Sequence, residues 1–173
     1  MIARTKIAIG LGSNLGDRRT MIERAVGRLR EDVVEDLVAS SIYESPPWGY
    51  ADQPAFLNAV VTGICEWEPP AVVSYLRGLE ALLGRTPSFP NGPREIDLDL
   101  LAWGEKRWAT DGVSVPHPRM GDRDFVLLPL AEIWPDWVHP GLGKTVAQLS
   151  AALPADSPAR ARRVGSLGET PAP

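Results

Sequence analysis

The spacing of hydrophobic residues along the chain alternates between the patterns typical of strands and of helices. Apolar runs, or an alternation of apolar and polar residues, predict four strands, over residues 6–11, 36–43, 56–66 and 94–101. Hydrophobic residues three or four positions apart predict four helices, over residues 18–30, 69–83, 125–133 and 146–152. Their order is typical of an α+β sandwich, in which a mostly antiparallel sheet has helices packed on one face.

Proline, glycine and polar residues mark the connections between these elements. The last predicted strand is expected to form a hairpin through residues 103–106. Two loops rich in proline and glycine span 45–54 and 85–92. The end of the chain is mainly Pro, Ala, Arg, Ser and Gly, with few apolar side chains to bury. We therefore expect one domain over 1–153 and a disordered C-terminal tail over 154–173.

Composition limits the class of protein. The 173 residues suffice for one domain with a core, and the net charge of −4 argues against a nucleic-acid partner. Cys65 is the only cysteine and there are two histidines, so we expect neither an internal disulfide nor a site rich in cysteine or histidine. We find no signal-peptide pattern and no apolar run of about 18 residues. We expect a soluble, cytoplasmic monomer with no membrane partner.

Two carboxylates share one face of the last predicted strand. Asp97 and Asp99 are two positions apart, so their side chains leave the backbone on the same side, about 6.6 Å apart. Mg²⁺ prefers oxygen ligands and usually takes one or two carboxylates, with water and phosphates completing its shell. Arg94, just before the strand, is a planar cation suited to phosphate. A half-exposed strand with a solvated acidic face is the alternative interpretation.

A glycine-rich segment follows the first predicted strand. Gly10, Gly12 and Gly16 have the spacing G-x-G-x-x-x-G, which differs from the G-x-G-x-x-G of dinucleotide-binding folds. We therefore predict a tight turn from strand to helix, whose backbone N–H groups can approach a ligand.

Other residues suggest a bound heterocycle and a polyphosphate. Asn58 begins an apolar strand and needs partners, because an unpaired buried polar group costs roughly 1–3 kcal/mol. It either pairs with local backbone or binds a flat heterocycle between aromatic side chains, which are otherwise ordinary core residues. His117 lies between two prolines with Arg119 and Arg123 nearby. A histidine there is more often structural, but two arginines near the acidic strand favour a polyphosphate.

In this order, these segments resemble the 6-hydroxymethyl-7,8-dihydropterin pyrophosphokinases of folate biosynthesis. The resemblance covers roughly residues 5–152, and its segments are 9–17, 45–47, 52–58, 84–85, 92–99 and 115–120, with Arg123 and Phe125. It implies a ferredoxin-like α+β fold and the transfer of a pyrophosphoryl group from ATP to the pterin hydroxymethyl oxygen, which leaves AMP.

The same resemblance assigns residues to roles. It implies that Asp97 and Asp99 hold two Mg²⁺ ions, and that they act with Arg85 and Arg94 in catalysis. The pterin would contact Ser45, Pro46, Trp48, Phe56, Asn58 and Phe125. ATP, the co-substrate, would contact Glu80, Arg85, Arg94, Leu100, Ser114, His117 and Arg123. The loops at 45–55 and 85–93 are the expected lids over the site.

The chain departs from the family pattern in one lid. Asn91 stands where some relatives have a large aromatic residue, and Phe89 lies two positions earlier. The loop also lacks a second arginine close to Arg85. Two alternatives are a non-catalytic nucleotide- or pterin-binding relative and a Mg²⁺-dependent kinase for another small alcohol.

Overall fold

The computed structural model describes residues 3–110, 112–155 and 160–167. The strands of its main sheet are β1 (Thr5–Ser13), β2 (Glu35–Ala39), β3 (Ser41–Ser45), β4 (Phe56–Cys65), β5 (Asp97–Trp103) and β8 (Arg162–Ser166). The helices are α1 (Arg18–Asp32), α2 (Pro69–Leu82), α3 (Asp124–Ile133) and α4 (Val146–Ala151), with a 3₁₀ turn η1 at Met120–Asp122. The sheet has the order β5-β1-β4-β3-β8, with β2 also paired to β4, and every pairing is antiparallel. The predicted α+β class is confirmed.

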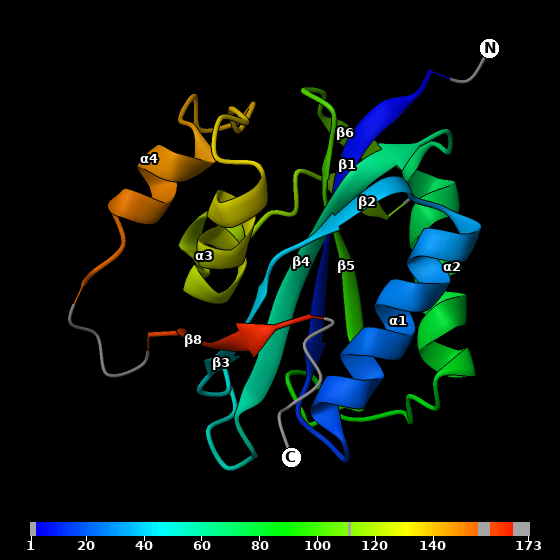
Figure 1. The fold of residues 1–173 in the computed structure, drawn as a ribbon, viewed down its shortest axis with the longest axis vertical. Helices are drawn as coiled ribbons and strands as arrows, with labels where there is room; N and C mark the ends of the chain where they lie inside the picture. Colours follow the sequence, from blue (N-terminus) through cyan, green and yellow to red (C-terminus); the bar gives the residue numbers. More distant parts are fainter. Residues whose placement is uncertain (1–2, 111, 156–159, 168–173) are drawn as a thin grey trace.

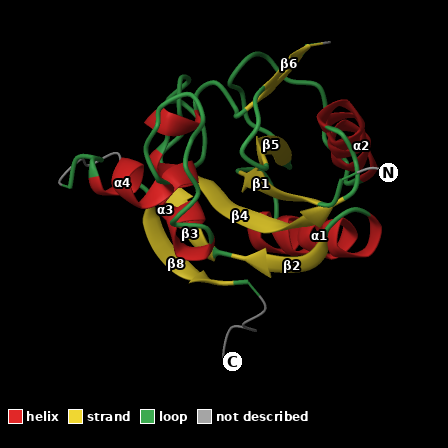
Figure 2. Ribbon diagram, turned by 90° about the horizontal axis from the view of Figure 1, so that it is seen from above, coloured by secondary structure: helices red, strands yellow, loops and turns green. Residues whose placement is uncertain are grey.

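Helices cover both faces of this sheet, so the prediction of helices on one face is wrong. Figures 1 and 2 show α1 and α2 on one side of the sheet and α3 and α4 on the other. In β1, Ile7 and Ile9 pack in the core beneath α1 and α2, whereas Ala8 packs beneath α3. The central strands are apolar on both faces, and a strand of that kind must be covered from both sides.

The single strand predicted over 36–43 is two strands. β2 pairs with the second half of β4 and β3 with its first half. Ser40 separates them: its backbone N–H donates to the Val60 carbonyl, and its hydroxyl accepts from the Val60 N–H at 2.9 Å. Because the hydroxyl replaces a backbone carbonyl, the ladder is interrupted for one residue without an unpaired donor.

The predicted hairpin through residues 103–106 is also wrong. After β5 the chain leaves the sheet, and the Gly104 N–H donates to the Lys6 carbonyl at 2.8 Å. β6 (Trp108–Thr110) then pairs with β7 (Val113–Val115) in a separate two-stranded sheet. Gly112, between β6 and β7, has φ +73°, a left-handed backbone conformation that favours glycine.

The predicted disorder of 154–173 is wrong for the described end of the chain. β8 pairs with the free edge of β3, and the Arg163 Nε donates to the Ser41 hydroxyl at 2.7 Å. Ala161, which directly precedes β8, is buried. Backbone pairing with an existing edge therefore orders a segment that has few apolar side chains. Residues 156–159 and 168–173 lie outside the described part of the chain, so the prediction is not tested there.

Within the described residues, no helix combines the length and the apolar character that a membrane span requires.

Candidate active site

Gly10 and Gly12 of β1 form the floor of a pocket that we call the central pocket. Gly12 pairs with Asn58 on β4 and with Asp97 on β5, while Gly10 pairs with Asp99. A Cβ on Gly12 would lie 3.3 Å from the Asn58 Oδ1, a tight contact, so glycine at this strand position lets the amide lie close against β1. Gly10 lies in β1, as the strand predicted over 6–11 requires, and Gly12 lies within the same strand, which runs to Ser13, rather than in the tight turn that we predicted.

The two aspartates lie side by side on β5 but differ in their surroundings. Asp97 accepts hydrogen bonds from Arg85 at 3.0 Å and from Arg94 at 3.3 Å. Asp99 has no such direct partner among the described residues, and burial raises its pKa to about 6, with the charge of Asp97 as the second cause. A site that penalises a second negative charge in this way is one that a bound cation would relieve.

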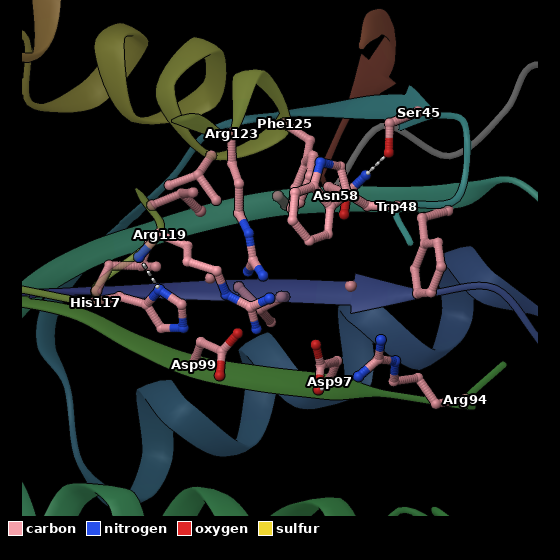
Figure 3. Close-up of a pocket in the computed structure, with 18 of the residues that line it drawn as sticks. Ser45, Trp48, Asn58, Arg94, Asp97, Asp99, His117, Arg119, Arg123 and Phe125 are labelled. Carbon is pink, nitrogen blue, oxygen red and sulfur yellow. Dashed lines mark hydrogen bonds and ion pairs between the residues drawn. The ribbon is translucent and has the colours of Figure 1, made fainter. Parts of the chain in front are cut away.

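Arginines face these carboxylates across the pocket. Figure 3 shows Arg123 and Arg119 extending toward Asp99 from one side, and Arg94 near Asp97. Among the described residues, the buried Nε atoms of Arg94 and Arg123 have no hydrogen-bond partner. Buried donors without partners are rare in folded proteins, and these point to an anionic ligand.

His117 is held as a neutral imidazole. Its backbone N–H donates to the Leu101 carbonyl at 2.9 Å, and its Nδ1 accepts from the Arg119 N–H at 3.2 Å. Burial lowers its pKa to about 4, and the nearby charges of Arg123 and Arg119 add to this effect. With Nδ1 as an acceptor, the proton of the neutral ring is on Nε2, which is free to donate to a ligand.

A second, adjoining pocket opens on the α2 side of the carboxylates. Glu80 is buried there, accepts from the Leu98 N–H at 2.7 Å and pairs with Arg85. Burial raises the pKa of Glu80, although these bonds oppose the shift. The predicted nucleotide residues that line this pocket are Glu80, Arg85, Leu100, Ser114 and His117.

The predicted pterin residues gather in the central pocket. Asn58 donates from Nδ2 to the Ser45 hydroxyl at 2.8 Å, so its partner is a side chain and not the local backbone. Trp48 lies 5.4 Å from the guanidinium groups of both Arg119 and Arg123. The pocket is lined by all six predicted pterin residues, Ser45, Pro46, Trp48, Phe56, Asn58 and Phe125, and by Arg94, Asp97, Asp99, His117 and Arg123.

The two predicted lids contact each other. Gln53 donates to the Asn91 carbonyl at 2.7 Å and accepts from Asn14 at 2.9 Å. Tyr50 and Phe89 meet edge to face, with ring centroids 5.1 Å apart. In this loop, Phe89 makes an aromatic contact that Asn91 cannot make. Closure of these loops over a ligand stays a prediction.

Sequence reasoning missed some residues of the site. Gly12 was interpreted as part of a turn, and the role of Gly10 and Gly12 as the pocket floor follows only from the strand register. Asn14, which accepts from the Arg94 N–H at 2.8 Å, lies in the segment 9–17 of the resemblance but was assigned no role. Its position after two glycines at a strand end was the only other indication.

Comparison with known proteins identifies the family. The sequence model of the 7,8-dihydro-6-hydroxymethylpterin-pyrophosphokinase (HPPK) family matches residues 8–135. The chain belongs to this family. A pyrophosphokinase of the same kind from Methylorubrum extorquens is 41% identical over 150 residues, which cover 86% of this chain and 94% of the relative. One from Bacillus subtilis is 44% identical over 126 residues, 72% of this chain and 75% of the relative.

Other family members are much longer than this chain. The folic acid synthesis protein fol1 of Pneumocystis carinii is 40% identical over 141 residues, which cover 82% of this chain but 19% of that protein. A Plasmodium falciparum HPPK-DHPS structure with pterin and p-hydroxybenzoate superposes with a TM-score of 0.68 at 15% identity, over 86% of this chain and 42% of the other. This likeness shows the fold, and the expected ferredoxin-like α+β architecture is confirmed.

Proposed function

We propose that this protein transfers the pyrophosphoryl group of ATP to the hydroxymethyl oxygen of 6-hydroxymethyl-7,8-dihydropterin, giving the pterin diphosphate and AMP. The observation that carries the proposal is the junction of two pockets at Asp97, Asp99 and His117. The central pocket offers the Asn58 amide, aromatic side chains and three arginines, and the adjoining pocket offers Glu80 and Arg85. Membership of the pyrophosphokinase family supports the same reaction.

Asp97 and Asp99 fit a site for Mg²⁺. They provide two carboxylates on one strand face, and the raised pKa of Asp99 reports the repulsion and burial that a cation would offset. No cluster of three or more acidic, histidine or cysteine ligands occurs among the described residues, so water and ATP oxygens would complete the shell. When bound, Mg²⁺ would neutralise phosphate charge at the reacting group. We propose two ions.

The residues of the chain mainly position the substrates and stabilise charge. Arg94 and Arg123 direct guanidinium groups at the polyphosphate, and His117 donates from Nε2 without adding charge. Asn58 can donate and accept hydrogen bonds along one edge of the pterin, with Phe56 and Phe125 beside the ring. Transfer of a phosphoryl-type group needs this alignment and charge stabilisation more than it needs a nucleophile from the protein.

Phosphorus NMR of the reaction tests the proposal. ATP, Mg²⁺ and 6-hydroxymethyl-7,8-dihydropterin should yield AMP and a pterin diphosphate, with no AMP when the pterin is omitted. ADP as the product would make the protein an ordinary kinase. Pterin binding without nucleotide turnover would favour the non-catalytic relative.

We also propose that the enzyme is a cytoplasmic monomer with small-molecule substrates only. The cytoplasm supplies ATP, Mg²⁺ and the reducing conditions that suit a reduced pterin. Light scattering of the purified protein would measure its mass, and a mass near 18.8 kDa would support the monomer.

A further inference from the structure

At the start of α3, two residues that line the central pocket flank one residue that does not. Arg123 and Phe125 line the central pocket, and Asp124 lies between them. The Asp124 Oδ1 accepts from the Phe125 N–H at 2.7 Å, and its Oδ2 accepts from the Ala161 N–H at 2.6 Å. One carboxylate therefore fixes the backbone between both pocket side chains and joins it to the C-terminal segment.

The C-terminal segment is itself fixed to another wall of the pocket. Directly after Ala161, β8 pairs with β3, so that Arg162 lies opposite Glu44. The next residue along β3 is Ser45, the hydrogen-bond partner of Asn58. Figure 2 shows β8 beside β3 at the edge of the sheet, on the side where α3 packs. Residues 160–167 therefore connect the wall formed by α3 to the wall formed by β3.

At its other end, α3 is attached to β3 directly. The Glu132 Oε2 accepts from the Ser41 N–H at 2.8 Å, and the Tyr43 hydroxyl donates to the Glu132 Oε1. Asp124 and Glu132 are eight residues apart, about 12 Å along a helix that rises about 1.5 Å per residue. Val126 and Leu130 also pack α3 on the sheet, so loss of the Asp124 bonds would leave the helix in place and free only the backbone of its first turn. A displacement of about 1 Å there can cost about 10²-fold in rate.

We propose that Asp124 is a positioning residue for the reaction, and that the segment 160–167 belongs to the catalytic unit. By holding the first turn of α3 against β8, Asp124 aims Arg123 at the phosphates and Phe125 at the pterin ring. This inference rests on the proposed function, because it concerns how that site is aligned.

Two variants break the connection from opposite sides. Asp124→Ala removes both acceptors, whereas Ala161→Pro removes only the N–H donor at 161 and keeps the bond from Asp124 to Phe125. The matched controls are Ala161→Gly, which keeps the N–H, and Asp122→Asn, which removes an exposed charge near the same helix end. Steady-state kinetics with the pterin varied, calorimetry with AMP and thermal melts are measured on the full chain.

The expected result separates alignment from general damage. In both variants kcat should fall about 10- to 100-fold and KM for the pterin should rise. Affinity for AMP should change less than about twofold. The adjoining pocket holds most of the predicted nucleotide residues, and none of its lining residues belongs to α3. The double variant should be no worse than Asp124→Ala alone, since both changes break the same bond. The controls should match wild type.

Several outcomes would overturn the positioning role. They are wild-type kinetics in Ala161→Pro, parallel losses of AMP and pterin affinity, or additive losses in the double variant. If Asp124→Ala does not fold, Ala161→Pro decides by the same criteria. Failure of the wild-type protein to form AMP with pterin would instead contradict the proposed function, so the two failures are distinguishable.

Discussion

Replacement of Asp99 by asparagine tests the electrostatics of the site directly. Burial and the neighbouring Asp97 raise the Asp99 pKa from 3.8 to about 6. A difference of about two units corresponds to about 3 kcal/mol, at about 1.36 kcal/mol per unit. Without metal, the folded protein therefore holds an ionised carboxylate at a cost that the unfolded chain does not have. We predict that Asp99→Asn raises the free energy of unfolding near pH 8 by up to about 3 kcal/mol and abolishes turnover.

The dependence on pH distinguishes this effect from a simple change in packing. A carboxyl group whose folded pKa is raised favours the folded state below its unfolded pKa, and that stability is lost as pH rises through the folded value. The stability difference between Asp99→Asn and wild type should therefore be small at about pH 4, grow up to about pH 6 and stay constant above about pH 7. An offset from packing would be the same at every pH.

Urea denaturation of both proteins in the presence of a chelator measures this difference. The titration is repeated with Asp122→Asn, which removes an exposed carboxylate outside the strand. Added Mg²⁺ should then stabilise the wild type and have little effect on Asp99→Asn, because binding to the folded state alone raises its stability. A stability difference that does not vary with pH, or a variant less stable than wild type at pH 8, would refute the electrostatic explanation.

Three further predictions concern the pterin contact, the paired arginines and the C-terminal strand. Asn58→Leu should weaken pterin binding by about 10-fold or more and barely change the affinity for a non-hydrolysable ATP analogue, measured by calorimetry; equal losses for both ligands would make Asn58 structural. Asp97→Ala removes the acceptor shared by Arg85 and Arg94 and should lower kcat on the order of 10³-fold in single-turnover assays; full activity would remove its assigned role. Deletion of residues 160–173 removes β8 and should lower the melting temperature by several degrees, at about 2–4 °C per kcal/mol; an unchanged melt would restore the interpretation of the segment as a dispensable tail.

The long periodic elements were predictable because their own side chains encode them. The helix predicted over 69–83 is observed at Pro69–Leu82, and the one predicted over 18–30 at Arg18–Asp32. Their hydrophobic residues three and four positions apart form a buried stripe whatever the partner element is. The apolar runs within β1 and β4 could also have indicated a sheet covered on both faces.

β8 was not predictable in the same way. Its residues, Arg162–Ser166, are mostly exposed and make their main bonds through the backbone. The ordering partner is the edge of β3, more than a hundred residues earlier, and side-chain periodicity carries no information about such pairing. The same limit applies to the pocket floor, because strand register alone brings Gly12 between Asn58 and Asp97.

That register has a consequence for inhibitor chemistry. Asn58 and Asp97 lie level with each other on strands on either side of β1, so two strand spacings, about 10 Å in total, separate their backbones. The hydrogen bonds between the strands keep this separation fixed. It therefore restricts the length of any molecule that joins a pterin-like ring near Asn58 to a phosphate-like group near Asp97. A molecule with a rigid linker that matches the distance between the two side-chain groups would lose translational freedom once for two anchors. A shorter or more flexible linker would reduce that gain in affinity.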